Sequence, residues 1–362
     1  MTSPTHTGEI WVLGAAGRIG GAVTSRLAAQ GFTTVLVGRG KDGLDKAAAN
    51  SGAGKKAKIV VTASTDDIAA EITRQRPAVV VNAIGSFAET ATPIARACMR
   101  AGGHYVDMAA DLVALPRIFV LHDDAAAAGS TLVTGAGFGV LAAEAVVAEL
   151  CENRPTPERV RVDALGSVGM SAGTMGSAFA ASIVDTLSMG GRAYENGRLV
   201  TARLGADPQH LTLPDGETVK SAGAPAGELM AAQRVSGAGS VTVTTALAPT
   251  SAIARAILPL AGKLLSIPAV QRFAVRRMAA VKVKATPRPR RHSWGHAVVT
   301  WPDGTRREGW LRADDGMDYT AAVAAETAAR LARGQGKPGA YTPAAALGPD
   351  LATAAGGTFI FD

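Results

Sequence analysis

Short apolar runs alternate with amphipathic segments through about the first 140 residues of the chain. Each run is four or five residues long, as in a buried parallel strand, and apolar residues at helical spacing follow most of the runs. The pattern predicts strands at residues 10–13, 34–38, 58–61, 78–82, 104–108 and 131–134, with helices between them. Strands that alternate with helices are typical of a doubly wound parallel sheet.

The pattern changes after about residue 140. Residues 159–165 and 240–245 alternate apolar and polar side chains, as half-exposed antiparallel strands do, and residues 297–305 predict a hairpin around an Asp-Gly turn. Residues 319–331 predict a long helix, and residues 342–351 predict a short capping segment. A second domain of mixed helices and strands therefore follows the first.

A glycine-rich loop joins the first predicted strand to the first predicted helix. The free N–H groups at a helix N-terminus attract a pyrophosphate, and glycine lets the backbone approach it closely. The alternative is a tight turn that binds no ligand. A turn of that kind can occur elsewhere in a chain, whereas this loop lies directly between a predicted strand and a predicted helix, as a dinucleotide-binding loop must. We therefore predict that the loop binds a dinucleotide through Gly14, Ala16, Gly17, Arg18, Ile19 and Gly20.

The second predicted strand ends at Arg39, at a position where NAD(H) is usually met by Asp or Glu. A guanidinium group is well matched to a phosphate, so Arg39 favours the 2′-phosphate of NADP(H), and Arg18 and Lys41 could extend the same cationic pocket. A solvated loop arginine is the alternative, because Asp42 and Asp45 are also nearby. The predicted cofactor is therefore NADP(H).

Further candidate residues follow the other predicted strands. The carboxyl ends of parallel strands meet at one crevice, which Asn82, Gly85, Asp107 and Gly137 are expected to face. The predicted cofactor contacts in this region are Asn82, Ala83, Gly85 and Phe87. The predicted catalytic residues are Asp107, Tyr105 and Ser171.

Proton transfer is the reason for choosing these catalytic candidates. Asp107 could relay a proton and Tyr105 or His104 could donate one, because strand alternation places Tyr105 and Asp107 on the same face. The structural alternative is that Asp107 caps the next helix and Tyr105 packs in the core. Ser171 and Thr174 either hydrogen-bond the substrate or begin a helix.

The available residues exclude several other kinds of site. No tyrosine is followed four positions later by a lysine, which excludes the Tyr–Lys mechanism of short-chain dehydrogenases. The two cysteines and six histidines show no metal-ligand spacing, so neither a metal site nor a disulfide framework is expected. Aromatic residues make up only 4% and no nucleic-acid-binding motif is present, so we expect no nucleic-acid partner.

The net charge of +7 comes largely from basic residues between Arg272 and Arg312. Residues 251–281 are apolar and cationic, but Arg255 and Lys263 interrupt the segment before it reaches the length of a membrane span. We expect a helix that caps a substrate pocket or forms a dimer face, with a helix on a membrane surface as the alternative. A homodimer, a small-molecule substrate and a cytoplasmic location are also expected, the last because the N-terminus is polar and cysteines are few.

The motifs taken together resemble a known family. In chain order they are Gly14–Gly20, Asn82–Phe87, Tyr105–Asp107, Gly135–Phe138, Ser171–Thr174 and Tyr341–Gly348. This series is similar to that of the saccharopine dehydrogenase-like reductases, and within them to the trans-acting enoyl reductase branch. The chain departs from the family pattern at Ser86, Gly139 and Ala172, where Pro, Asp and Arg are frequent.

The resemblance implies an α/β fold with three parts. These are a Rossmann NADP-binding domain at residues 1–140, a mixed substrate and dimerisation domain at 141–312, and a helical segment at 313–362 that packs back on the first domain. It also implies an NADPH-dependent oxidoreductase that reduces a polarised C=N or C=C bond of a small metabolite by hydride transfer. The alternative left open is a non-catalytic NADP-sensing or scaffold protein, which could associate with a membrane surface.

Overall fold

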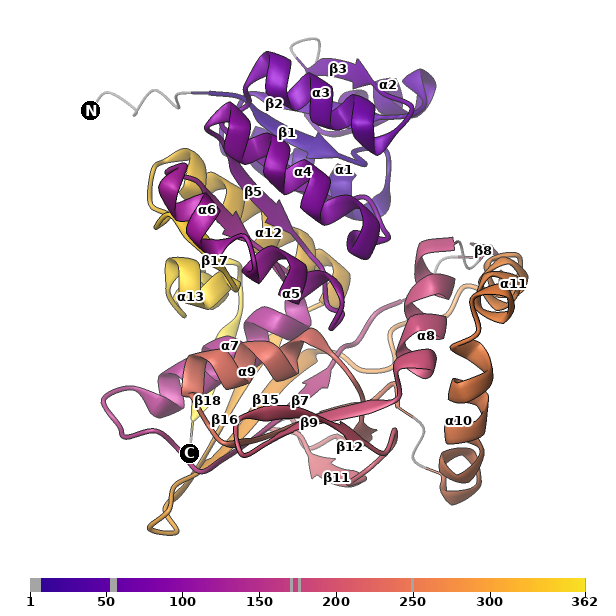
Figure 1. Cartoon of the computed structure of the whole chain (residues 1–362), viewed down its shortest axis with the longest axis vertical. Coiled ribbons are helices and arrows are strands. Elements are labelled where there is room, and N and C mark those ends of the chain that lie inside the picture. Colours follow the sequence, from indigo (N-terminus) through magenta and orange to yellow (C-terminus); the bar gives the residue numbers. More distant parts are fainter. Residues whose placement is uncertain (1–7, 53–56, 170–171, 175–176, 249–250, 362) are drawn as a thin grey trace. The chain divides into compact units, whose positions relative to one another are not determined.

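The computed structural model describes residues 8–52, 57–169, 172–174, 177–248 and 251–361. The chain divides into two compact units (Figure 1). The first contains residues 1–141 and 317–356, and the second contains residues 142–316 and 357–362. The α/β fold class predicted from the sequence is confirmed, because the first unit has a parallel Rossmann-like sheet and the second a separate mixed sheet.

The sheet of the first unit has seven strands in the order β17-β6-β5-β4-β1-β2-β3. All of its recorded strand pairs are parallel. The strands are β1 (Ile10–Leu13), β2 (Thr34–Gly38), β3 (Lys58–Val61), β4 (Val79–Asn82), β5 (His104–Asp107), β6 (Thr131–Val133) and β17 (Gly339–Tyr341). Six of these strands lie where the apolar runs predicted them. β17 was not predicted, because its residues Gly339, Ala340 and Tyr341 include no long aliphatic side chain and form no apolar run.

Helices cover both faces of this sheet (Figure 1). They are α1 (Arg18–Ala29), α2 (Lys41–Asn50), α3 (Thr65–Gln75), α4 (Phe87–Ala101), α5 (Ala114–Phe119), α6 (His122–Ala127), α12 (Gly316–Ala332), α13 (Pro343–Leu347) and α14 (Leu351–Ala354). One face of the sheet packs Trp11, Leu13 and Tyr105 against Ile94 of α4 and Ile118 of α5 in a single core cluster. This core fixes the carboxyl ends of the strands, where the predicted cofactor residues lie.

The sheet of the second unit is mixed, with a main path in the order β10-β9-β13-β7-β15-β16-β18 and with β11 and β12 at its side. Its strands are β7 (Arg159–Leu165), β9 (Gly191–Glu195), β10 (Arg198–Ala202), β11 (Gln209–Thr212), β12 (Thr218–Gly223), β13 (Ser240–Thr245), β15 (Ser293–Thr300), β16 (Arg306–Ala313) and β18 (Thr358–Phe361). The predicted hairpin is present as β15 and β16, joined by a turn in which Trp301 N donates to Thr305 O at 2.9 Å.

β7 and β13 were expected to be antiparallel strands, and this holds in part. β7 pairs antiparallel with β15, and β13 pairs antiparallel with β9 and β12. β7 and β13 pair with each other in parallel, because α9 (Gly227–Ser236) returns the chain before β13 begins. The C-terminal segment was expected to be helical and to pack on the first domain. Its helices α12, α13 and α14 belong to the first unit, whereas its last residues form β18, which pairs with β16 of the second unit. A strand at an edge is specified by its partner rather than by its own four residues.

The second sheet has two different faces. On one face lie α9 and α7 (Phe138–Cys151), and an added Cβ at Gly295 would come 2.5 Å from Cβ of Ala142 in α7 (Figure 1). The other face carries a core of Leu165, Trp294 and Trp310, which Leu213 and Val219 from the β11–β12 region cover. Three further helices, α8 (Ser177–Met189), α10 (Ala252–Leu265) and α11 (Pro268–Ala279), pack on one another beside a small pair of strands, β8 (Gly173–Thr174) and β14 (Lys282–Val283).

Candidate functional site

The glycine loop between β1 and α1 is held by contacts that only glycine allows. Gly14 has φ +74°, and a Cβ at this position would lie 3.0 Å from the carbonyl oxygen of Ala83. A Cβ at Gly20 would lie 2.4 Å from the carbonyl oxygen of Gly14. The first glycine therefore makes the turn, and the third lets α1 pack closely against the strand that precedes it.

The loop presents the N-terminus of α1 to solvent. Gly17 is the N-cap residue with extended backbone geometry, and no described side chain caps the helix. Ala16, Gly17 and Arg18 are exposed, while Ile19 is half-buried. Amide groups in the first helical turn that lack a capping side chain, together with the positive end of the helix dipole, form a site suited to an anion.

Arg39 lies beside this loop. β1 and β2 pair in parallel with Leu13 opposite Val37, so the segments that follow both strands leave the sheet at the same edge. An added Cβ at Gly43 in α2 would come 3.3 Å from Cβ of Ala16, which places the start of α2 against the glycine loop. The structure thus brings together the loop and the arginine that the sequence selected for the same ligand.

The two cations after β2 differ in their partners. Arg39 is exposed and forms no hydrogen bond or ion pair with another described residue. Lys41 forms an exposed ion pair with Asp45, with Nζ 2.7 Å from Oδ2, and this partner raises the pKa of Lys41. Arg39 is therefore the cation in this segment that can bind a phosphate without losing a partner.

A buried polar network lies at the carboxyl ends of β4 and β5. Asn82 Nδ2 donates to the hydroxyl of Tyr105 at 3.1 Å and to Oγ1 of Thr90 at 3.2 Å. Asn82 Oδ1 accepts from the amide of Ile84 at 3.1 Å, which fixes the loop that contains Ala83 and leads to Gly85. Beyond Gly85, α4 begins at the half-buried Phe87. The predicted cofactor residues after β4 therefore adjoin the glycine loop through the contact between Gly14 and Ala83.

Asp107 ties β5 to the segments that follow it. Its Oδ1 accepts from Ala109 N at 2.9 Å, Thr134 Oγ1 at 2.8 Å and Gly135 N at 3.1 Å. Its Oδ2 is buried without a hydrogen-bond partner of normal geometry among the described residues. Burial raises the pKa of Asp107, and burial together with the Asp107 charge raises the pKa of Tyr105. Both side chains are buried, which agrees with the alternative that Tyr105 packs in the core.

The other catalytic candidates lie elsewhere. Ser171 falls outside the described residues, so its predicted role rests on the sequence alone. Thr174 is part of β8, and the helix that follows, α8, begins at Ser177. His104 and Asp107 are the first and last residues of β5, so they lie at its two ends. His104 Nδ1 accepts from the amide of Thr131 at 3.0 Å.

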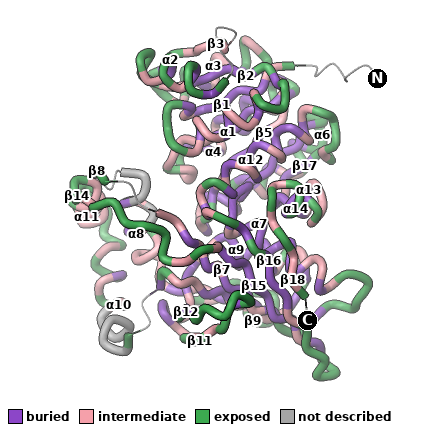
Figure 2. Tube along the Cα trace, turned by 180° about the vertical axis from the view of Figure 1, so that it is seen from behind, coloured by how far each residue is buried: buried purple, intermediate pink, exposed green. Residues whose placement is uncertain are grey.

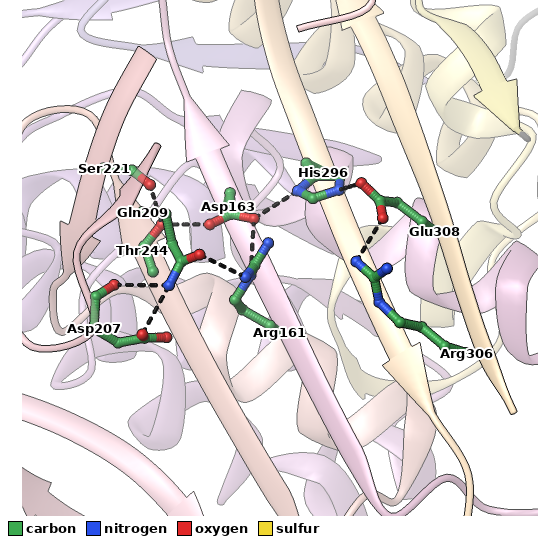
Figure 3. A network of polar contacts seen from close by, with 9 residues as sticks. All are labelled: Arg161, Asp163, Asp207, Gln209, Ser221, Thr244, His296, Arg306 and Glu308. Carbon is green, nitrogen blue, oxygen red and sulfur yellow. Dashed lines mark hydrogen bonds and ion pairs between the residues drawn. The ribbon is translucent and has the colours of Figure 1, made fainter. Parts of the chain in front are cut away.

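Sequence reasoning missed a second polar network, in the second unit (Figure 3). The buried His296 of β15 lies between Asp163 of β7 and Glu308 of β16, with Nδ1 2.6 Å from Asp163 Oδ2 and Nε2 2.9 Å from Glu308 Oε1. Burial opposes the imidazolium charge, but the hydrogen bonds that the ring donates to both carboxylates raise the pKa of His296. The ring also stacks on Trp310, with centroids 3.8 Å apart.

Further polar groups complete this network. Arg161 Nε lies 3.3 Å from Asp163 Oδ2, Arg306 Nη2 lies 2.6 Å from Glu308 Oε2, and Thr244 donates to Asp163. The sequence signal was the alternation that puts Arg161 and Asp163 on one face of their strand. That alternation does not show which strands are neighbours, so no role for His296 followed from the sequence.

The comparisons with known proteins agree with this geometry. Residues 10–133 match the family model described as the saccharopine dehydrogenase NADP binding domain. These residues form a saccharopine dehydrogenase-type NADP-binding domain. The NADP(H) cofactor predicted from Arg39 is thereby confirmed at the level of the family. A domain of this type supports an NADP-dependent oxidoreductase in general.

Similar solved structures extend the likeness to the fold of the whole chain. Apo histidine-tagged saccharopine dehydrogenase (L-Glu forming) from Saccharomyces cerevisiae has a TM-score of 0.61 at 12% identity, over 98% of this chain and 100% of that one. A short-chain dehydrogenase/reductase from Serratia marcescens has a TM-score of only 0.32 at 14% identity, over 36% of this chain and 74% of its own, and supports no conclusion. No curated protein matches the chain.

Proposed function

We propose that the protein is an NADPH-dependent reductase that transfers a hydride to a polarised C=N or C=C bond of a small metabolite. The position of Arg39 beside the glycine loop of an NADP-binding domain carries this proposal. Arg39 has no partner among the described residues, and it lies next to a helix N-terminus that no described side chain caps. This arrangement fits a ligand with phosphates at both positions.

The residues divide the binding of NADP(H) between them. The first-turn amides of α1 would hold the pyrophosphate, with Gly14 and Gly20 allowing the close approach, and Arg39 would hold the 2′-phosphate. Lys41 contributes less, because Asp45 already neutralises its charge. The loop at Ala83 lies against Gly14, so it would contact a part of the cofactor beyond the pyrophosphate.

The bound cofactor supplies the hydride, and the chain must position the substrate, exclude water and provide a proton. Asp107 and Tyr105 remain the proposed proton relay. Burial raises the pKa of Asp107, which favours the protonated form that a relay needs. Because neither side chain is exposed, this role requires the segments after β5 and β6 to open around the substrate.

A second candidate function is NADP sensing without catalysis. The complete burial of Asp107 and Tyr105 favours it, since three hydrogen bonds to Asp107 serve the local structure alone. A sensor needs the cofactor site of the first unit but no accessible proton donor.

One set of measurements separates the two candidates. NADPH binding is first measured by fluorescence titration, and then the loss of NADPH absorbance is followed with a panel of cyclic imines and α,β-unsaturated acyl thioesters. Binding with turnover of one of these classes supports the reductase, and the class identifies the bond that is reduced. Binding without turnover of either class supports the sensor. Absence of NADPH binding contradicts both.

A further inference from the structure

The helices α10 and α11 pack against α8 in the second unit. In α10 the packed side includes the half-buried Leu258 and the buried Gly262, and an added Cβ at Gly262 would lie 2.7 Å from the carbonyl oxygen of Leu187 in α8. In α11, Gln271 Nε2 donates to Asp185 Oδ1 of α8 at 2.8 Å. Other described positions of the two helices are exposed to solvent.

Several of the exposed positions carry large apolar side chains. Leu260 is 73% exposed and Leu264 is 57% exposed, and their spacing of four places them on one face of α10. Ile267, the N-cap residue of α11, is 48% exposed. Phe273 of α11 is 65% exposed. Exposed positions run along α11, which has no fully buried residue (Figure 2). Large apolar side chains grouped in this way mark an interaction surface rather than an ordinary exterior.

Basic residues surround these apolar side chains. Residues 251–302 contain ten of the 37 Lys and Arg residues and none of the 30 Asp and Glu residues, which leaves a net charge of −3 on the rest of the chain. Arg272, Arg276 and Arg277 flank Phe273 on α11, and Lys263 lies beside Leu264 on α10. Asp185 of α8 is the acidic group that contacts α11 in the described structure, through Gln271.

The chemistry of this surface selects its partner. Apolar side chains that enter an acyl-chain boundary, ringed by Lys and Arg that reach lipid phosphates, are the pattern of helices lying on an anionic bilayer. A twofold contact between two copies would instead place this cationic surface against itself, at an electrostatic cost. No helix in the described parts of the chain is long and apolar enough to cross a membrane, so the surface would lie on a bilayer.

We propose that the α10–α11 surface, defined by Leu260, Leu264, Ile267, Phe273 and the basic residues around them, docks the protein on anionic membranes. The arginines supply the attraction to the headgroups, and the leucines and Phe273 supply insertion. This proposal is independent of the proposed function, because none of these residues belongs to the cofactor site.

The test is co-sedimentation of the full chain with vesicles. One set of vesicles contains equal parts of phosphatidylglycerol and phosphatidylcholine, and the other contains phosphatidylcholine alone. We expect binding to the anionic vesicles only. Replacing three cations in R272Q/R276Q/R277Q should weaken this binding by roughly 100-fold, at about fivefold for each charge removed near an anionic surface. L260S/L264S/F273S should weaken it by about tenfold or more.

A matched control removes the same charge elsewhere on the second unit. R159Q/R198Q/K220Q changes three exposed basic residues outside the surface and should leave vesicle binding within about twofold of the unaltered chain. Circular dichroism and NADPH affinity, measured on every variant, confirm that the fold is retained.

Four results would overturn the proposal. The first is a failure of the unaltered chain to bind anionic vesicles at low ionic strength. The second is an equal loss of binding in the control variant. The third is unchanged vesicle binding of L260S/L264S/F273S. Charge attraction alone would then explain the binding, and the protein would bind any polyanion, such as duplex DNA, in the same way. The fourth is a stable dimer, detected by sedimentation velocity, that dissociates in this apolar variant, because the surface would then be a dimer interface.

Discussion

Replacing Arg39 with alanine tests the cofactor site most directly, because the side chain is exposed and its loss leaves no cavity and no buried group unpaired. A hydrogen bond to a charged group contributes about 1.5–3 kcal/mol, which corresponds to a loss of about 10- to 150-fold in NADPH affinity. Exposure and salt screening place the expected loss nearer to about tenfold. NADH lacks the 2′-phosphate, so its affinity should change by less than about twofold.

The assay is a fluorescence titration of the Arg39→Ala variant with NADPH and with NADH, at low and at high salt. The preference for NADPH over NADH should fall by the same factor as the NADPH affinity, and the difference between the variant and the unaltered chain should shrink as salt rises. Lys41→Ala is the matched control and should have a smaller effect, since Asp45 already pairs with Lys41. Equal losses for both cofactors, or none for NADPH, would refute the role of Arg39.

Three further predictions concern the glycine loop and the two buried polar networks, which contain Tyr105 and His296. Gly20→Ala should destabilise the protein to urea by about 1–3 kcal/mol and weaken NADPH binding. Gly21→Ala, in the same helix, would place its Cβ in ordinary contact 3.4 Å from the carbonyl oxygen of Ala15 and should do neither. Tyr105→Phe removes an acceptor from the buried amide of Asn82 and should cost about 1–3 kcal/mol in the same urea assay, while no loss would show that the hydrogen bond is dispensable. Because the folded-state pKa of His296 is raised, its charged form stabilises the protein below the unfolded pKa of about 6.5, and this contribution is lost as pH rises through the folded-state value. The gap in unfolding free energy between the unaltered chain and His296→Gln should therefore narrow from mildly acidic to alkaline pH, and a constant gap would contradict the charged state.

The sequence alone located the glycine loop and most of the first sheet. Buried parallel strands are short continuous apolar runs, and the strands at residues 10–13, 34–38 and 58–61 have the predicted bounds. The spacing of Gly14, Gly17 and Gly20 is equally local, because the turn and the close approach of the helix act within seven residues. Arg39 could be assigned to the same site because consecutive parallel strands of this fold end at the same edge.

Only the tertiary structure decided what each polar side chain faces. Strand alternation put Tyr105 and Asp107 on one face but did not show that both are buried and that Asp107 accepts from segments after β5 and β6. The pairing of Asp163 with His296 joins residues 133 positions apart, and the parallel alignment of β7 with β13 depends on the intervening chain. Register between distant strands depends on the packing of whole faces, which no local pattern of residues records.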